Sequence, residues 1–217
     1  MNIIEAKDLR INVNNDYYLD NISFSIQEGE TCVLYAPSNE AKAILKAIYL
    51  EKRALDGEIL YFSESTDKYN RNDIDEWHAS DISYIDKNDN LFFNLTILEN
   101  ITLPQSINRV DIDKDYLDEV VRALKIDNLL DKYPIDLSRY ERLRVSVARA
   151  VISKPYILLI DNAFDFLNKA HQEEAFELLN SINSMFHITL FHATTNINML
   201  KYATKRLVLE EEILSEL

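Results

Sequence analysis

Glycine is scarce in this chain of 217 residues, which contains only Gly29 and Gly57. At the average usage of roughly 7%, a chain of this length would carry about fifteen glycines. Glycine lets the backbone approach a bound phosphate closely and adopt positive φ angles. The composition therefore argues against a site that wraps phosphate groups in glycine-rich backbone.

The chain has only one cysteine, and it lacks a net basic charge and long apolar runs. The single cysteine, Cys32, rules out an intramolecular disulfide framework, and its apolar neighbours predict a small buried residue. The net charge of -14 disfavours nucleic acid as a partner, because proteins that track phosphate backbones are basic. No apolar run approaches the roughly 20 residues that span a bilayer, and no signal-peptide pattern opens the chain. We therefore expect a cytoplasmic protein.

The residues that are present predict alternating strands and helices. Apolar alternation and short apolar runs predict strands at residues 2–13, 17–36 (two strands around Gly29), 57–62, 81–85, 156–161, 188–192 and 205–209. Helical spacing predicts helices at residues 40–53, 137–153, 169–182 and 196–203, and a helical pattern over residues 100–131. The polar residues 65–77 are interpreted as a loop. This order predicts one domain, residues 1–217, with a parallel α/β core, an antiparallel β subdomain and a helical subdomain at about residues 88–150.

One strand-loop-helix segment, residues 34–48, carries a lysine in its loop and reads LYAPSNEAKAILKAI. The layout is that of a phosphate-binding loop, usually G-x-x-x-x-G-K-[ST], where lysine and backbone amides hold phosphates and the hydroxyl holds Mg²⁺. Ala36 and Ala41 stand at the glycine positions, and Ala43 stands at the hydroxyl position. Lys42 remains, either as a retained phosphate-loop lysine or as a surface lysine on a helix.

Several separated stretches, in order, resemble the nucleotide-binding subunit of ATP-binding cassette (ABC) transporters, a P-loop NTPase-like fold. Residues 132–161, KYPIDLSRYERLRVSVARAVISKPYILLID, are similar to the family's signature helix and Walker B strand. Residues 90–104 resemble the segment after the Q-loop, and residues 20–30 resemble the entry to the phosphate loop. Residues 190–195, LFHATT, are similar to the switch-histidine strand. The details resemble the single-domain subunits of the cell-division, lipoprotein-release and macrolide-export branch.

The resemblance assigns a role to each matched position. For the nucleotide it implies adenine stacking by Tyr17 or Tyr18 and phosphate binding by Ser38, Asn39 and Lys42. For the metal and the catalytic water it implies a direct Mg²⁺ ligand at the position of Ala43, a water-mediated contact from Asp161, the general base at the position of Asn162 and the switch histidine at His192. It places the Q-loop position at Lys87 and the D-loop position at Asn168, and it implies signature contacts to the partner subunit's ATP from Ser138, Arg139, Tyr140 and Glu141.

Several of these positions carry side chains unsuited to the family's chemistry. Ala43 cannot ligate a metal, and Asn162 cannot accept a proton from water near neutral pH. Loss of a general base costs about 10²–10⁴ in rate. Arg139 and Tyr140 are large where the family has glycine, and Glu141 adds negative charge, although it also suits a capping box with Ser138. These departures imply weak binding of ATP and Mg²⁺, or none, and little or no hydrolysis.

The sequence therefore predicts a degenerate ABC-type ATP-binding subunit with a structural or regulatory role. The resemblance implies docking on an integral membrane protein of a transport or cell-division-like complex, at the inner face of the membrane, through residues 87–104. It also implies a homodimer or a heterodimer. Two alternatives stay open: an active ABC ATPase subunit that energises transport as part of a heterodimer, and a soluble module repurposed to bind another ligand. On residue type alone, Asp161 and His192 also fit structural roles.

Overall fold

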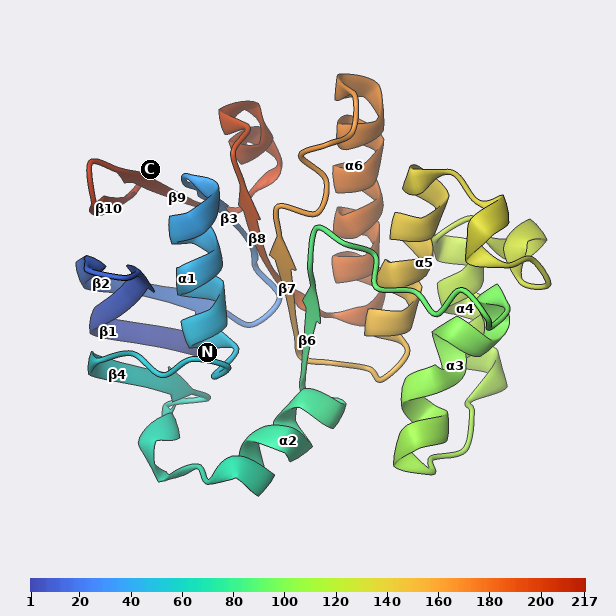
Figure 1. Ribbon diagram of the computed structural model, residues 1–217, viewed down its shortest axis with the longest axis horizontal. Helices are drawn as coiled ribbons and strands as arrows, with labels where there is room; N and C mark the ends of the chain where they lie inside the picture. Colours follow the sequence, from blue (N-terminus) through green and yellow to red (C-terminus); the bar gives the residue numbers. More distant parts are fainter.

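Two sheets form the framework of the computed structural model, which describes all residues from 1 to 217 (Figure 1). The strands of the antiparallel sheet are β1 (Asn2–Asn14), β2 (Tyr17–Gln27), β4 (Asp56–Tyr61) and β5 (Glu64–Ser65), in the order β2-β1-β4-β5. The strands of the larger sheet are β3 (Thr31–Tyr35), β6 (Ile82–Ile85), β7 (Ile157–Asp161), β8 (Thr189–Thr194), β9 (Lys205–Glu210) and β10 (Ile213–Glu216), in the order β10-β9-β3-β8-β7-β6. Only β10 is antiparallel to its neighbour.

Six α-helices pack around these sheets. They are α1 (Ser38–Ile48), α2 (Arg71–Ser80), α3 (Ile97–Asn108), α4 (Lys114–Ala123), α5 (Arg139–Val151) and α6 (Lys169–Phe186). Short 3₁₀ turns cover Thr66–Lys68, Asp127–Leu129, Pro134–Asp136 and Ile197–Tyr202. Helix α1 lies between the two sheets, whereas α5 and α6 lie on the other side of the larger sheet and α3 and α4 lie beyond them (Figure 1). The predicted combination of a parallel core and an antiparallel β subdomain is confirmed.

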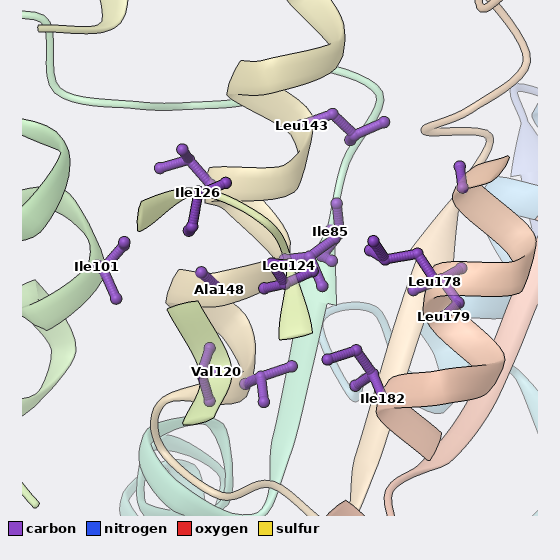
Figure 2. Packing of buried hydrophobic residues seen from close by; sticks show 14 of the residues in the cluster. Ile85, Ile101, Val120, Leu124, Ile126, Leu143, Ala148, Leu178, Leu179 and Ile182 are labelled. Carbon is purple, nitrogen blue, oxygen red and sulfur yellow. The ribbon is translucent and has the colours of Figure 1, made fainter. Parts of the chain in front are cut away.

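Two apolar cores hold these layers together. One contains 27 buried residues and joins α3, α4, α5 and α6 to β6 and β7, as Figure 2 shows for Leu124, Leu143 and Leu179. The other contains 26 buried residues and encloses α1 between the sheets. Every residue of β7 is buried, which explains why that strand reads as a continuous apolar run rather than an alternating one.

The interpretation of residues 65–77 as a loop is wrong, because most of this polar stretch begins α2. Asn70 caps the helix: its Oδ1 accepts hydrogen bonds from the amides of Asn72 and Asp73, at 2.8 and 3.3 Å. The Asp73 carboxylate accepts the Asn70 amide in return, at 2.8 Å. The helix buries no residue fully, but the Trp77 ring stacks on Tyr61 with centroids 4.7 Å apart. The capping box and one aromatic anchor therefore form this helix without an apolar stripe.

The scarcity of glycine leaves other residues in backbone conformations that glycine usually supplies. Fourteen non-glycine residues have positive φ. Two of them, Glu211 and Glu212, are adjacent, with φ of 47° and 67°, in the two-residue turn between β9 and β10. Such turns strongly favour Asn-Gly, because L residues with a side chain cost roughly 1–2 kcal/mol in the left-handed region.

We predict that replacing Glu211-Glu212 with Asn-Gly stabilises the protein by about 1 kcal/mol, because both residues then suit the turn. Urea unfolding of the two proteins measures the difference. The matched control is the double variant Glu211→Gln, Glu212→Gln, which removes the same charges and keeps two strained side chains. An equal gain in the control would attribute the stabilisation to charge and contradict the role given to backbone strain.

Candidate functional site

The predicted site residues meet where the parallel strands end. In sheets of this kind, ligands bind outside the carboxyl ends of the strands. Strand β3 leads into α1, which carries Lys42, and β7 ends at Asp161, followed by Asn162. Strand β6 contributes Tyr84, whose hydroxyl reaches Asp161. The structure therefore brings Lys42, Asp161 and Asn162 together, as the resemblance implies.

The segment between β3 and α1 becomes helical before it reaches Lys42. Strand β3 ends at Tyr35 and α1 already begins at Ser38, so Asn39 and Ala41 are helical and neither has a positive φ. The amide of Ala41 donates to the carbonyl oxygen of Pro37 at 2.9 Å. In a phosphate loop such amides point at the ligand. Here the amide of Ala41 is committed to the helix itself.

Lys42 forms ion pairs within the chain. Its Nζ lies 3.5 Å from Oδ2 of Asp86 and 3.9 Å from Oδ2 of Asp161. Its side chain is 36% exposed, so it is only partly a surface lysine. The sequence predicted a site residue at Lys87, which is exposed and forms no ion pair, and did not identify its neighbour Asp86. A carboxylate that directly follows β6 was the available signal.

Asp161 is buried, with only 2% of the residue exposed, and its carboxylate is satisfied by its neighbours. The Tyr84 hydroxyl donates to Oδ2 at 2.9 Å, and the Asn162 side-chain amide donates to Oδ1 at 2.7 Å. Burial raises the pKa of Tyr84, and the charge of Asp161 raises it further, so Tyr84 remains a protonated donor. Asn162 thus serves as a hydrogen-bond donor to Asp161, in a backbone conformation with φ of 49°.

The residues present do not fit a bound Mg²⁺ ion. Mg²⁺ at a nucleotide site keeps several waters and takes few protein ligands, and the direct ligand in a phosphate loop is a hydroxyl that Ala43 lacks. Ala43 packs against the apolar core around α1, and the two nearby carboxylates, Asp86 and Asp161, face the Lys42 ammonium group. The ammonium group supplies the positive charge that these carboxylates require.

An acidic hollow of about 950 Å³ opens beside the amino end of α1. Four glutamates line it, together with Tyr17 and Tyr35, and no lysine or arginine does; the glutamates are Glu40, Glu210, Glu211 and Glu212. The Tyr17 hydroxyl donates to Glu40 at 3.2 Å, whereas the half-buried Tyr18 has its ring centre 5.0 Å from the Arg10 guanidinium. Of the two predicted adenine-stacking residues, only Tyr17 lines the hollow. Carboxylates in this position repel a triphosphate.

The signature segment is engaged in helix capping and local packing. Ser138 caps α5: its hydroxyl accepts the Glu141 amide at 3.2 Å and donates to the Glu141 carboxylate at 2.7 Å, which lowers the pKa of Glu141. The Arg139 guanidinium lies 3.2 Å from the centre of the Phe166 ring. Tyr140 stacks on His171 with centroids 4.8 Å apart. The predicted capping box is confirmed.

Asn168, at the D-loop position, also caps a helix. Its Oδ1 accepts the amide of His171 at 3.0 Å at the start of α6. The loop between β7 and α6 is fastened to the end of β8 by Asp165, which accepts hydrogen bonds from the Thr194 hydroxyl at 2.5 Å and the Thr195 amide at 2.7 Å. The side chains in this loop therefore bind neighbouring strands and helices.

His192, the predicted switch histidine, lies in the core and does not line the site. The residue lies inside β8, two positions before the strand ends, and is 1% exposed. Its ring stacks on Phe176 at 4.5 Å and meets the edge of Phe164 at 5.3 Å, and neither ring nitrogen has a hydrogen-bond partner. Burial lowers its pKa to about 4, opposed by the charge of Asp165. His192 is a neutral core residue.

We predict that His192→Phe reduces the loss of stability in acid. The folded-state pKa of about 4 lies below the ordinary value of 6.5, so between these pH values the unfolded chain binds the proton more readily. Stability therefore falls as the pH drops from about 6.5 to about 4, at up to about 1.4 kcal/mol per pH unit. Relative to the native chain, the variant should gain about 2 kcal/mol between pH 7.5 and 4.5.

Urea unfolding at the two pH values measures this difference, with His192→Leu as a second, smaller replacement. Parallel pH profiles for the native chain and both variants would contradict the assignment of a buried neutral histidine.

The fold is that of a P-loop NTPase-like cassette, and the residues described above meet at the edge of the sheet where such cassettes bind their ligand. Comparison with known proteins supports this assignment of the fold. The family model described as ABC transporter matches residues 19–165. The chain is 32% identical over 179 residues to the ABC transporter ATP-binding protein YxdL of Bacillus subtilis (strain 168), across 81% of this chain and 70% of that protein. The chain belongs to the ABC transporter family.

More distant relatives show the same cassette. The chain is 27% identical over 208 residues to the methionine import ATP-binding protein MetN of Legionella pneumophila (strain Lens), and this match spans 94% of the chain but 61% of MetN. The structure of cbiO1 from Clostridium perfringens, part of the ABC transporter complex cbiONQ, has a TM-score of 0.87 at 20% identity, over 99% of this chain and 87% of that one. A dimeric ATP-binding cassette bound to ADP and Pi, MJ0796, has a TM-score of 0.82 at 21% identity, over 98% of each chain. At these identities the two structures establish the fold.

Proposed function

We propose that this chain is a non-catalytic member of the ABC transporter family that serves a structural or regulatory role in a membrane complex. The observation that carries the proposal is the start of α1 at Ser38, with the amide of Ala41 bonded to Pro37. The segment that would wrap a triphosphate is a helix. Lys42, which would neutralise phosphate, is paired with Asp86 and Asp161.

The surrounding charges support the same proposal. A bound triphosphate would lie beside the glutamates of the acidic hollow, and it would have to separate Lys42 from two carboxylates. Removing one partner from a buried ion pair costs about 3–5 kcal/mol, and this pair should fall below that range because Lys42 is partly exposed. Nucleotide binding would therefore have to offset both repulsion and the loss of internal pairing.

An apolar surface supports docking on a membrane partner. Phe92 and Phe93, at the start of the helical region, are 50% and 53% exposed, and Leu98 on α3 is 37% exposed. These residues lie within the segment 87–104 to which the resemblance assigns partner contact. None of the helices combines the length and the apolar character needed to cross a membrane. We propose that the chain reaches the membrane by binding an integral membrane protein through this surface.

We expect purified protein to bind ATP weakly, with a dissociation constant of roughly 1 mM or more, equivalent to about 4 kcal/mol of binding free energy or less. Binding should be unchanged by Mg²⁺, because Ala43 offers no ligand and Asp161 already has its partners. Calorimetry with ATP in Mg²⁺ and in EDTA measures both quantities, and phosphate release should stay far below the roughly 10 s⁻¹ of a median enzyme.

The matched variants are Lys42→Ala and Lys46→Ala, which remove one charge from the same helix. Neither should change the titration with ATP. Lys42→Ala should lower stability by roughly 1–2 kcal/mol, because it removes the cation beside the buried Asp161 carboxylate, whereas Lys46→Ala breaks only a more exposed ion pair with Glu51 and should cost less. The contrary result would be ATP binding that depends on Mg²⁺ and that is lost in a folded Lys42→Ala variant. It would mean that Lys42 still binds phosphate.

Docking is tested by Phe93→Asp, which places a charge on the proposed contact surface. In host cells that express the tagged chain, we expect the membrane-bound fraction to fall at least about fivefold, because burying an unpaired carboxylate is unfavourable. Leu55→Asp is the control, since Leu55 is 60% exposed and lies outside residues 87–104. Equal membrane binding of the native chain and both variants would show that this surface makes no contact.

A further inference from the structure

The carboxyl ends of three helices meet at the amino edge of the larger sheet. Helix α2 leads into β6 and α5 leads into β7, so both helices end at this edge, the lower one in Figure 1. The end of α3 joins them, because the side-chain amide of Asn108 donates to the carbonyl oxygen of Ala79 at 3.3 Å. Residues of all three ends line a hollow of about 570 Å³, a size typical of small-molecule sites. We call it the helix-end hollow, and it lies at the opposite edge of the sheet from the candidate functional site.

The helix-end hollow is negatively charged. Glu76 and Asp111 line it, and neither forms an ion pair within the chain. Asp113 also lines it, but its carboxylate accepts a hydrogen bond from Lys154, the one basic residue of the lining, at 2.8 Å. The carboxyl ends of the helices add partial negative charge. The helix-end hollow therefore favours a cation.

A buried acceptor without a partner belongs to the same lining. Only 7% of Gln105 is exposed, and its Oε1 has no hydrogen-bond partner. Its Nε2 donates to the carbonyl oxygen of Ile152 at 3.4 Å, which is long for a hydrogen bond, so the amide can turn its oxygen toward the hollow at little cost. An unpaired buried acceptor is unfavourable, and a ligand that donates a hydrogen bond removes this cost. Gln105 therefore indicates a ligand that carries a donor.

Apolar groups form much of the remaining lining and its surroundings. Ala79, Val110 and Ile152 line the helix-end hollow. Val110 is 60% exposed, and Ile107 and Ile112, close to it in the sequence, are 69% and 39% exposed. The carboxylates are not grouped to hold a metal ion, and a bare cation would leave the apolar surface in contact with water. A ligand with an alkyl chain would cover it.

We propose that the helix-end hollow binds an aliphatic primary amine. Such an amine is protonated near neutral pH, as lysine is. Its ammonium group lies between Glu76 and Asp111 and donates to Gln105, and its alkyl chain lies on Val110 and Ile152. A bound amine thereby links α2 to the segment that follows α3. The site goes beyond the proposed function and is independent of it, because it uses no residue of the candidate functional site.

Heteronuclear NMR of the full chain tests the site during a titration with n-hexylamine at constant pH and ionic strength. The side-chain amide signal of Gln105 should shift and saturate, with a dissociation constant of about 1 mM. 1-Hexanol keeps the alkyl chain without the charge, and ammonium chloride keeps the charge without the chain. Each should bind at least about tenfold more weakly than the amine, because each makes only part of the contact.

Substitutions in the lining test the role of each group. Glu76→Gln and Asp111→Asn should each raise the dissociation constant for n-hexylamine about fivefold or more, because each removes a charge near the ammonium group. Gln105→Met keeps a side chain of similar length without the acceptor and should raise it about threefold or more. Asp118→Asn is the matched control, since this exposed carboxylate of α4 does not line the hollow and should have no effect.

The contrary results are equally specific. No shift of the Gln105 signal, or equal binding of n-hexylamine and 1-hexanol, overturns the proposal. Binding that is lost in the double variant Glu211→Gln, Glu212→Gln and unchanged in Glu76→Gln also overturns it, because the amine would then be attracted by the acidic hollow beside α1. Circular dichroism of each variant confirms folding. Glu76 and Asp111 are exposed, so their variants decide the question even if Gln105→Met does not fold.

Discussion

The buried carboxylate of Asp161 determines how the carboxyl edge of this molecule is built. A charge with 2% of its residue exposed is tolerated only when it is paired and hydrogen-bonded. Tyr84 from β6, Asn162 just after β7 and Lys42 from α1 all contact this one group. It thereby connects three elements that are distant in sequence. Asp161, to which the resemblance assigns a water-mediated metal contact, is paired with Lys42 in this structure.

The helical start of α1 follows from the alanines in this segment. Alanine favours a helix over glycine by about 1 kcal/mol, so Ala41 promotes helix where glycine would permit a loop. Once Ser38 to Ala43 are helical, the amide of Ala41 is bonded to Pro37, and Lys42 projects from the helix within reach of Asp86 and Asp161. The loss of glycine and the internal pairing of the lysine are thus parts of one local structure.

The fold was largely predictable because its signals are local and periodic. The apolar run of β7 and the capping box at Ser138 both led to correct elements, whereas α2 was missed because its polar sequence depends on the Asn70 cap and on Trp77. The site was predictable in position but less so in detail. Ion pairing by Asp86 and the burial of His192 depend on neighbours supplied by distant segments, which no single stretch reveals. Sequence spacing identifies the strand in which a residue lies. It does not predict whether the side chain is buried or exposed, because a shift of one or two positions along a strand changes that.

The most direct measurement of the central claim is hydrogen exchange at the amides of Ala41 and Lys42, with and without millimolar ATP and Mg²⁺. If the segment is a helix that does not bind phosphate, both amides exchange slowly in the free protein, at rates similar to the middle of α1, and nucleotide leaves those rates unchanged. If it is a phosphate-binding loop, the amides exchange rapidly in the free protein and become protected when ATP is added. The second result would contradict the account.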